Sequence, residues 1–467
     1  MADLRLLQLN IEYGGTGVDF EKVVDVVLES GAVVAAIQEG CGAMPRLAAG
    51  LGWPYVDNRT QVVSQHPLLD PPDPSGGSVL VEVEPGRVVA IVNVHPPSRR
   101  YGPFRVAKGE GDERLLASER RIRLSALQPS LDAAARFMRD GVPVVLLGDF
   151  NAPSHLDWTE AAVLSRPHVL RPVRWPTSAA AEECGLVDAF RAVHPDPVAV
   201  PGLTWPAERP YVEGYNPAAD GHAPDRIDLM LVSPDVRVGD VQVVGEEGSP
   251  HSQIVFAPWP TDHRGLLADL SVSAAPAPTL VSASRRIVAV GDVVDVRVNC
   301  PDLGSVVAVP RGADPGAVGS ALTPAGAGLW QLRTEPVGAG RYDVVACDTG
   351  GRERARTSLW VAGPDDGPTL RTDRSFYGVD EVVTVRWSWA PGNRADWLAM
   401  YPLGTSPSGS RPLMQVATGA TVEGQAIFSA RSHPRRWPLP PGRFTVHLLM
   451  DDLPVSLASH DFVVHET

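Results

Sequence analysis

The pattern of apolar residues changes near residue 274, and this change constrains the fold more than any other feature of the sequence. Before it, short apolar runs alternate with segments of helical periodicity at residues 19–30 and 115–139. After it, a Pro/Ala linker at residues 274–280 leads into sequence rich in Val, Thr, Gly and Pro, without helical spacing. We therefore expect a domain of sheets and helices followed by all-β structure. The runs predicted as strands are residues 4–11, 33–38, 77–82, 88–95, 142–147, 226–232 and 266–272.

The all-β region contains an internal repeat. PTLVSASRRIVAVGDVVDVRV, from residue 278, parallels PTLRTDRSFYGVDEVVTVRW, from residue 368, and GRYDVVACD parallels the later GRFTVHLLMD. The spacing of about 90 to 100 residues is too long for a solenoid repeat and is typical of β-sandwiches of the immunoglobulin type. The sequence thus predicts a first domain at residues 1–273 and two immunoglobulin-like β-sandwiches at residues 278–362 and 368–467.

The charge balance limits the classes of partner. Lys and Arg together number 41 and Asp and Glu together 55, so the formal net charge is −14. Such a surface repels phosphate backbones on average, which disfavours broad, non-specific binding to nucleic acid. No apolar run approaches the ~20 residues of a membrane helix, so we expect no transmembrane segment. The first residues, MADLR, lead directly into a strand-like run, and we expect a cytoplasmic protein unless a signal peptide precedes them.

Polar side chains stand at the ends of six strand-like runs in the first region. A single such residue is usually a turn former or a helix cap. Six such ends in one domain, all carrying carboxylate, amide or imidazole groups, favour a site at the rim where a sheet brings strand ends together. The residues are Asn10, Gln38 with Glu39, His95, Asp149 with Asn151, Asp225 with Asp228, and Asp262 with His263.

The chemistry of this set suits a hard metal ion and a phosphate. Carboxylates such as Glu39 and Asp262 are oxygen ligands for Mg²⁺, with Mn²⁺ as the alternative, and the set is too rich in oxygen for structural zinc. His263 can contact a phosphate oxygen or act as a general acid or base, and a carboxylate such as Asp228 can fix its tautomer.

Asp149 and Asn151 lie two residues apart across a tight turn in the segment GDFN. One can orient the attacking water, and the other can donate a hydrogen bond to the negative charge that develops on the phosphate. The implied reaction is metal-assisted, in-line attack of water on a phosphoester, without a covalent intermediate.

In this order, the motifs LN, QE, a strand-end His, GDFN, RID and DH resemble those of the endonuclease/exonuclease/phosphatase superfamily, which includes deoxyribonuclease I-like nucleases. The resemblance covers residues 1 to about 272. It implies an α/β four-layered sandwich, in which two packed sheets are flanked by helices, and a metal-dependent phosphoesterase activity.

The resemblance also implies the metal-site residues, which are Asn10, Glu39 and Asp262, with Glu39 as the main ligand. Glu12, two residues after Asn10, stands where some relatives place an acidic metal-site residue. We treat Glu12 as a secondary candidate.

The same resemblance implies catalytic roles for five residues. His95 would contact the phosphate, Asp149 would orient the nucleophilic water, and Asn151 would position the phosphate. Asp228 would pair with His263.

The segment DRID offers two partners for His263, because it contains both Asp225 and Asp228. Some relatives have DRI and others RID, so the resemblance leaves both acids open. We favour Asp228, since the apolar run LMLVS that follows it fits RID leading into a strand.

Two segments next to these motifs are candidates for substrate binding. Residues 98–108 carry Arg99 and Arg100 among aromatic residues, a composition that can hold an anionic group or stack on a base. Residues 204–225 are aromatic and rich in Gly and Pro, and Trp205 there can wall the pocket. The alternative for both segments is an ordinary surface loop.

We expect, first, a phosphoesterase that acts on a nucleotide-like or other small phosphoester, which the acidic surface suits. The alternatives are an endonuclease or exonuclease acting on DNA or RNA, a sphingomyelinase-like phospholipid phosphodiesterase, and a non-catalytic binding scaffold. The β-sandwich domains carry no catalytic pattern, and we expect them to bind a partner that the sequence does not identify.

Overall fold

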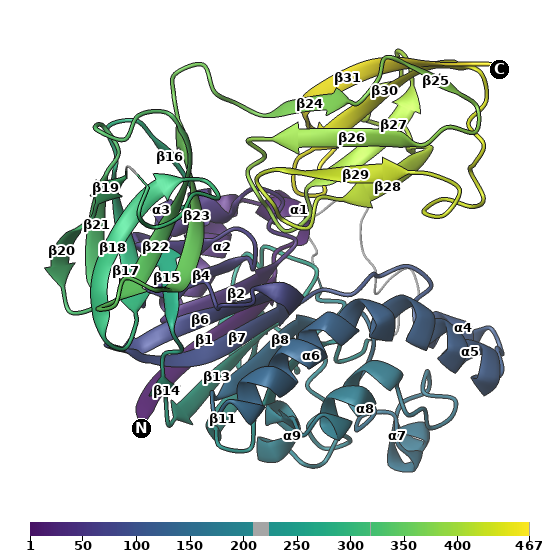
Figure 1. Cartoon of the computed structure of the whole chain (residues 1–467). Coiled ribbons are helices and arrows are strands. Elements are labelled where there is room, and N and C mark those ends of the chain that lie inside the picture. The colour runs from purple at the N-terminus through teal and green to yellow at the C-terminus, as the bar shows by residue number, and fades with distance from the viewer. Residues whose placement is uncertain (209–223, 318, 467) are drawn as a thin grey trace. The chain divides into compact units, whose positions relative to one another are not determined.

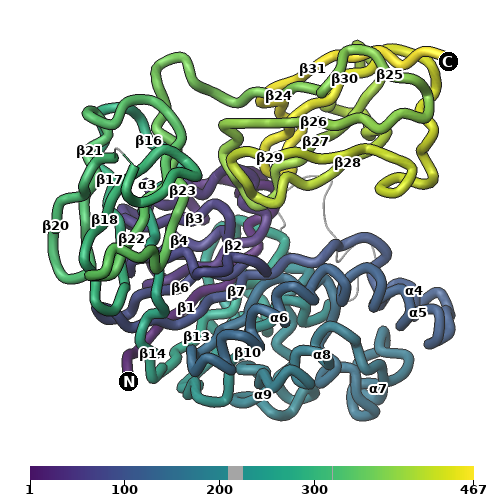
Figure 2. Tube along the Cα trace, viewed as in Figure 1, coloured from purple at the N-terminus to yellow at the C-terminus, as the bar shows by residue number. Residues whose placement is uncertain are grey.

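The computed structural model describes residues 1–208, 224–317 and 319–466. The predicted substrate segment 204–225 therefore falls in part, at residues 209–223, outside the described residues. The chain divides into two compact units, residues 1–282 and residues 283–467. Figures 1 and 2 trace the elements of both units along the chain.

Two β-sheets form the centre of the first unit. In spatial order, the first sheet comprises β12 (Ile254–Phe256), β11 (Arg237–Glu246), β13 (Gly265–Val272), β1 (Ala2–Asn10), β2 (Val34–Gln38), β4 (Val62–Ser64) and β3 (Tyr55–Asp57). β1 pairs parallel with β2 and antiparallel with β13. The carboxyl ends of β1 and β2 therefore lie at the same edge as the amino end of β13.

The second sheet carries the GDFN and RID motifs. In spatial order, it comprises β5 (Leu68–Leu69), β6 (Ser78–Glu84), β7 (Arg87–Val94), β8 (Val144–Asp149), β10 (Asp228–Val232) and β9 (Val187–Asp188). β7 and β8 run parallel, and β10 runs antiparallel to β8.

The predicted linker at residues 274–280 belongs in part to this second sheet. β14 (Ala275–Pro276) pairs antiparallel with β7. Ala275 and Ala277 are buried, since their small side chains pack closely against the outer face of the sheet. The compositional signal of a linker was therefore wrong for these residues, because alanine suits a tight packing site as well as a flexible one.

Helices cover the outer faces of both sheets. In chain order, the α-helices are α1 (Glu12–Gly15), α2 (Phe20–Glu29), α3 (Met44–Leu51), α4 (Gly102–Ala107), α5 (Asp112–Glu119), α6 (Ser125–Arg139), α7 (Glu160–Ser165), α8 (Pro176–Glu183) and α9 (Ala189–Val193). The helix predicted at residues 19–30 is confirmed as α2, which Asp19 caps by accepting a hydrogen bond from the backbone amide of Glu21. Within the described residues, every helix is too short or too polar to cross a bilayer.

The helix predicted at residues 115–139 is interrupted in the structure. A π-helical turn at Arg120–Leu124 joins α5 to α6. Within this turn Arg123 is fully buried and donates a hydrogen bond to Glu119, one helical turn earlier, at 2.8 Å. Such turns are frequent at functional sites, where they redirect individual side chains.

The two sheets pack face to face because their strands carry apolar residues on both faces. Leu4 and Leu6 of β1 lie in the core between the sheets, whereas Leu7 and Leu9 point to the opposite face, toward α2 and α3. The outer face of the second sheet packs against α6 and α8. The unit is therefore the four-layered sandwich that the resemblance implied, with helices, sheet, sheet and helices in order (Figure 1).

The second unit is all-β in its described residues. Its first sheet comprises, in spatial order, β15 (Leu280–Ala283), which begins before the unit boundary, β17 (Val293–Asn299), β21 (Leu329–Arg333) and β20 (Thr323–Gly326). Its second sheet comprises β16 (Ile287–Ala289), β23 (Glu353–Ala362), β22 (Gly340–Asp348), β18 (Leu303–Pro310) and β19 (Ser320–Ala321). The third sheet comprises, in spatial order, β24 (Thr369–Thr372), β26 (Val383–Ser388) and β29 (Gly424–Phe428). The fourth sheet comprises β25 (Phe376–Gly378), β31 (Ser456–His465), β30 (Gly442–Leu449), β27 (Trp397–Pro402) and β28 (Met414–Ala417).

The sequence repeat reappears in the strand pairing of this unit. β16 runs parallel to β23, and its counterpart β25 runs parallel to β31. β22 and β30, which carry the second repeated motif, each pair antiparallel with these same partners. The immunoglobulin-like identity and the boundaries 278–362 and 368–467 stay predictions.

Candidate active site

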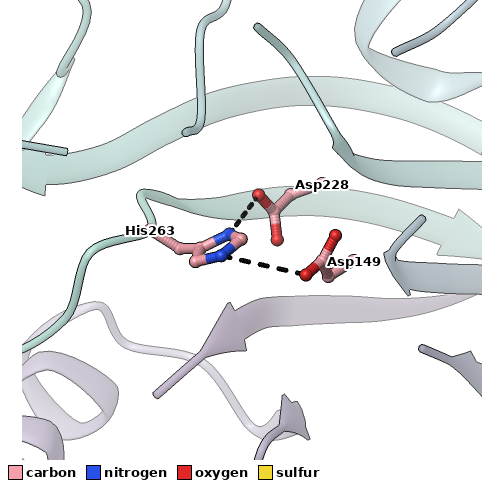
Figure 3. Close-up of side chains that lie close together, drawn as sticks. All are labelled: Asp149, Asp228 and His263. Atoms are coloured by element: carbon pink, nitrogen blue, oxygen red, sulfur yellow. Dashed lines mark hydrogen bonds and ion pairs between the residues drawn. The ribbon is translucent and has the colours of Figure 1, made fainter. Parts of the chain in front are cut away.

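Three buried side chains from separate elements of the first unit converge at one point (Figure 3). Asp149 ends β8 and lies directly opposite Asp228, the first residue of β10, in the antiparallel register. His263, which precedes β13, places Nδ1 2.9 Å from Asp228 Oδ2 and Nε2 3.8 Å from Asp149 Oδ2. Oxygen and nitrogen atoms of all three lie within 4.8 Å of one another, close enough to hold a metal ion.

Burial and mutual charge shift the pKa values of this trio. Burial would lower the pKa of His263, but the charges of Asp228, Asp262 and Asp149 raise it well above its ordinary value. Burial would raise the pKa of Asp149, but His263, His95 and a backbone amide lower it below its ordinary value. Burial raises the pKa of Asp228 despite the opposing charge of His263. The surrounding carboxylates therefore favour the imidazolium form of His263.

Asn10 and Glu39 adjoin the trio from the first sheet. The parallel register of β1 and β2 sets Asn10 beside Gln38, so Glu39 follows at the same edge. Asn10 donates from Nδ2 to Glu39 Oε1 and to Asp149 Oδ2, each at 3.2 Å. Glu39 has a φ of 56°, a left-handed conformation that is costly outside glycine, and its Oε2 accepts a hydrogen bond from the backbone amide of Tyr13. The chain holds this carboxylate in a strained but fixed position.

His95 and Asn151 also contact Asp149. His95 Nε2 lies 3.4 Å from Asp149 Oδ2 and 3.9 Å from Glu39 Oε1, and its side chain is one-quarter exposed. Asn151 donates its backbone amide to Asp149 Oδ1 at 2.7 Å and its side-chain amide to Pro96 O at 3.0 Å. These contacts fix both oxygens of Asp149 at the centre of the site.

Asp262 joins the site through two neighbours. Its Oδ1 lies 3.9 Å from His263 Nε2, and its Oδ2 accepts a hydrogen bond from Trp205 Nε1 at 3.1 Å. Of the three predicted substrate residues, Trp205 is thus in direct contact with the site. Arg99 and Arg100 are exposed on the loop after His95.

The structure pairs His263 with Asp228 and places Asp225 elsewhere. Asp225 is fully buried and accepts hydrogen bonds from Tyr101 Oη and Trp158 Nε1. Both acids of the DRID segment are therefore engaged, but with different partners.

A buried network of side-chain amides supports Asp228, and the sequence motifs named only Gln38 among its members. Gln8 Nε2 donates to Asp228 Oδ1 at 2.7 Å and to Gln38 Oε1 at 2.6 Å. Gln38 donates in turn to Asn93 Oδ1 at 2.7 Å, and Asn93 donates to the backbone oxygen of Ile37. All three amide side chains are fully buried. A polar residue inside an otherwise apolar strand, as in LRLLQLN and IVNVH, is the signal that could have found them.

Arg226 anchors the chain just before Asp228. It is fully buried and bonds Asp157 Oδ2 and Asp188 Oδ2, each at 2.8 Å. Arg191 also bonds Asp157, at 2.6 Å. These paired charges hold the start of β10 in place from the side away from His263.

This network predicts acid-sensitive stability. Burial would raise the pKa of Asp188, but Arg226 and Arg191 lower it below its ordinary value of 3.8. The carboxyl of Asp188 therefore binds a proton more tightly in the unfolded chain than in the folded one. The stabilisation that ionised Asp188 gives the fold is complete above its ordinary pKa of 3.8, and it is lost as the pH falls through the pKa of Asp188 in the folded state. Urea unfolding between pH 7 and pH 3 should show this loss, and it should be smaller in Asp188→Asn. An unchanged acid dependence in that variant would contradict the assignment.

Comparisons with known proteins agree with this geometry. A model of the endonuclease/exonuclease/phosphatase family matches residues 7–263, more than half of the chain. The chain is 28% identical over 292 residues to an uncharacterized protein of Caenorhabditis elegans, a match that spans 57% of this chain and 90% of that protein.

Two solved structures are also similar to the chain. One is an endonuclease/exonuclease/phosphatase from Beutenbergia cavernae DSM 12333, with 16% identity, a TM-score of 0.36, and coverage of 99% of this chain and 100% of that one. The other is an AP endonuclease from Archaeoglobus fulgidus, with 16% identity, a TM-score of 0.34, and coverage of 58% of this chain and 100% of that one. By the family match over residues 7–263, the chain belongs to the endonuclease/exonuclease/phosphatase family.

Proposed function

We propose that this chain is a divalent-metal-dependent phosphoesterase that hydrolyses a small, nucleotide-like phosphoester by in-line attack of water. The observation that carries the proposal is the convergence of the His263–Asp228 pair on Asp149, with Glu39 and His95 beside them. The imidazole supplies a phosphate contact, and the carboxylates of Glu39 and Asp262 supply oxygens for a hard cation.

The donor set fits Mg²⁺, or Mn²⁺ in its place. Glu39 is half-buried and presents a carboxylate to the site, and Asp262 adds a second carboxylate. Asn10 lies beside Glu39, to which it donates a hydrogen bond from Nδ2. Asp228 is fully buried and holds the ring of His263, whereas Glu39 keeps one-quarter of its side chain exposed. We therefore assign the cation to Glu39, Asn10 and Asp262 rather than to the His263 trio. When bound, the cation would polarise the phosphoester and offset the negative charge that develops on it.

The remaining residues orient the attacking water or contact the phosphate. Asp149, with its lowered pKa, stays ionised and accepts a hydrogen bond from the attacking water, which it orients. His263, as an imidazolium, donates from Nε2 to a phosphate oxygen, while Asp228 holds its Nδ1. His95 contacts the phosphate from the exposed side, and Asn151 keeps Asp149 in place.

Metal removal tests the proposal. The panel comprises bis-p-nitrophenyl phosphate, nucleotides, inositol phosphates, sphingomyelin, plasmid DNA and RNA. Turnover should occur with Mg²⁺, stop with EDTA and return when Mg²⁺ or Mn²⁺ is added in excess. Metal-independent turnover would contradict the mechanism, and failure on every substrate would favour a binding scaffold. Faster turnover of DNA, RNA or sphingomyelin than of the small phosphoesters would replace the proposed substrate class with that of the faster substrate.

Glu39→Gln extends this test to the assigned ligand. The variant should raise the Mg²⁺ concentration needed for half-maximal rate ~10-fold or more, because even residues behind metal ligands typically change affinity by that factor. Glu84→Gln, an exposed acid at the end of β6, is the matched control and should leave the Mg²⁺ dependence unchanged. The same Mg²⁺ dependence in Glu39→Gln and in the control would remove Glu39 from the metal site.

A further inference from the structure

Asp225 is a buried carboxylate that the proposed reaction does not use. It is fully buried, and its side chain accepts hydrogen bonds from Trp158 Nε1 at 2.9 Å and from Tyr101 Oη at 3.1 Å. His168 Nε2 lies 3.4 Å from it. Burying a carboxylate is costly unless donors surround it. Here the donors belong to aromatic side chains, so Asp225 fixes the positions of rings.

The main chain of Asp225 also holds Trp205. The backbone amide of Asp225 donates to Trp205 O at 2.8 Å, and the backbone amide of Trp205 donates to Asp225 O at 3.0 Å. Through its side chain and its main chain, one residue therefore holds both Tyr101 and Trp205.

Three rings meet beside the proposed phosphate site. The rings of Tyr101 and Trp205 pack edge to face, with centroids 5.5 Å apart, and Phe104 lies 5.0 Å from Tyr101 and 6.5 Å from Trp205. We call Tyr101, Phe104 and Trp205 the aromatic wall. Tyr101 is buried, whereas Phe104 and Trp205 are half-buried and keep part of their surface exposed.

Close packing at Gly102 fixes the chain between Tyr101 and Phe104. A Cβ at Gly102 would lie 2.3 Å from the Trp175 ring and 2.9 Å from Glu119 Oε1, so only glycine lets α4 approach this closely. Arg123, in the π-helical turn, donates to the backbone oxygens of the preceding loop. The wall is thus built on a rigid, buried base rather than on a free surface loop.

The wall adjoins the reacting groups. Trp205 Nε1 donates to Asp262 Oδ2 at 3.1 Å, and the Trp205 ring centroid lies 6.3 Å from that of His263. A group attached to the phosphate is therefore within reach of exposed aromatic surface. Ring faces bind planar, aromatic groups such as nucleobases by stacking.

We propose that the aromatic wall determines specificity, with Trp205 and Phe104 binding a planar aromatic group, such as a nucleobase, carried by the phosphoester. Asp225 is the positioning residue of the wall. The inference rests on the proposed function for the location of the phosphate, and it deepens that function by naming the part of the substrate that is recognised.

The test compares two ligands that differ only by a base. Adenosine 5′-methylenephosphonate and ribose 5-methylenephosphonate share the phosphate analogue and the sugar, and neither can be hydrolysed. Calorimetry in Mg²⁺ should show that the wild-type protein binds the adenosine analogue roughly 10-fold or more tightly, the usual effect of one stacked base. Equal binding of the two analogues, or no binding of either, would overturn the proposal.

Variants of Trp205 separate the effect of its ring from the effect of the hydrogen bond that its indole N–H donates. The binding ratio is the affinity for the adenosine analogue divided by the affinity for the ribose analogue. Trp205→Leu should bring this ratio close to one. Trp205→Phe keeps a ring but lacks the indole N–H, so it should keep most of the ratio while changing turnover. Asp225→Asn, of the same size, should lower the ratio without abolishing phosphate-analogue binding. Phe376→Leu, an aromatic residue 64% exposed in the second unit, is the control and should leave the ratio unchanged. An unchanged ratio in Trp205→Leu would overturn the role of the wall.

The test distinguishes this inference from the proposed function. Because the analogues are not hydrolysed, the binding ratio does not depend on turnover. Absence of turnover on every substrate would contradict the phosphoesterase proposal, but the binding ratio of the two analogues would still test the aromatic wall. Normal, metal-dependent turnover with a ratio near one would keep the phosphoesterase and remove the wall.

Discussion

Replacing His263 by alanine is expected to lower kcat/KM for the phosphoester at least ~100-fold, because the variant loses the imidazolium that faces the phosphate. His263 is held with Nδ1 on Asp228 and Nε2 toward Asp149 and Asp262. Asp149→Ala should lower the rate by at least the same factor, since it removes the acceptor that orients the water. Initial rates are measured at saturating Mg²⁺, so that metal affinity does not limit them.

Two further measurements separate chemistry from folding. Asp228→Ala should lower the rate by itself but add little in the His263→Ala background, because Asp228 acts through His263. His465→Ala, an exposed residue in the second unit, is the matched control and should keep the wild-type rate. Wild-type rates in both His263→Ala and Asp149→Ala would refute the mechanism.

Replacing Arg226 by methionine is expected to lower the free energy of unfolding by about 3–5 kcal/mol, the usual result of leaving buried charges without their partner. Arg226 is fully buried between Asp157 and Asp188, which are also buried. Methionine fills much of the same space but leaves both carboxylates facing an apolar side chain. Because Arg226 lies two residues before Asp228, the first residue of β10, the same loss should disturb Asp228 and reduce turnover.

Urea unfolding followed by tryptophan fluorescence measures this effect. Arg237→Met, at the exposed start of β11, is the control and should change the free energy of unfolding by no more than about 0.5 kcal/mol. A loss below about 1 kcal/mol in Arg226→Met would show that the carboxylates find other partners or are protonated in the variant.

The local pattern of apolar residues was sufficient to predict the central strands and the helix α2, which follows β1 along the chain. The runs at residues 4–11 and 142–147 correspond to β1 and β8, because fully buried strands are continuous apolar runs in any context. β11 was missed, since it begins exposed and polar and is interrupted by a bulge between Val238 and Asp240. Its strand conformation depends on pairing with β13, which no local pattern within β11 reveals.

The identities of the site residues followed from the sequence more readily than their contacts did. The motifs named Asp149, Asp228 and His263, but only the antiparallel register of β8 and β10 sets the two acids opposite each other. That register also decides between the acids of DRID. It sets Asp228 opposite the last residue of β8, whereas Asp225, three residues earlier, accepts a hydrogen bond from Tyr101 of the aromatic wall.

The sequence by itself determined the family, the alternation of strands and helices in the first unit, the all-β second unit and the polar groups at the strand ends. These are local properties, set by apolar periodicity and by short motifs. Only the tertiary structure decided which acid holds His263, that Gln8 supports Asp228 from the interior, and that Asp225 organises an aromatic wall. Those outcomes depend on strand register and on contacts between residues up to 220 positions apart, as between Gln8 and Asp228, which no local pattern encodes.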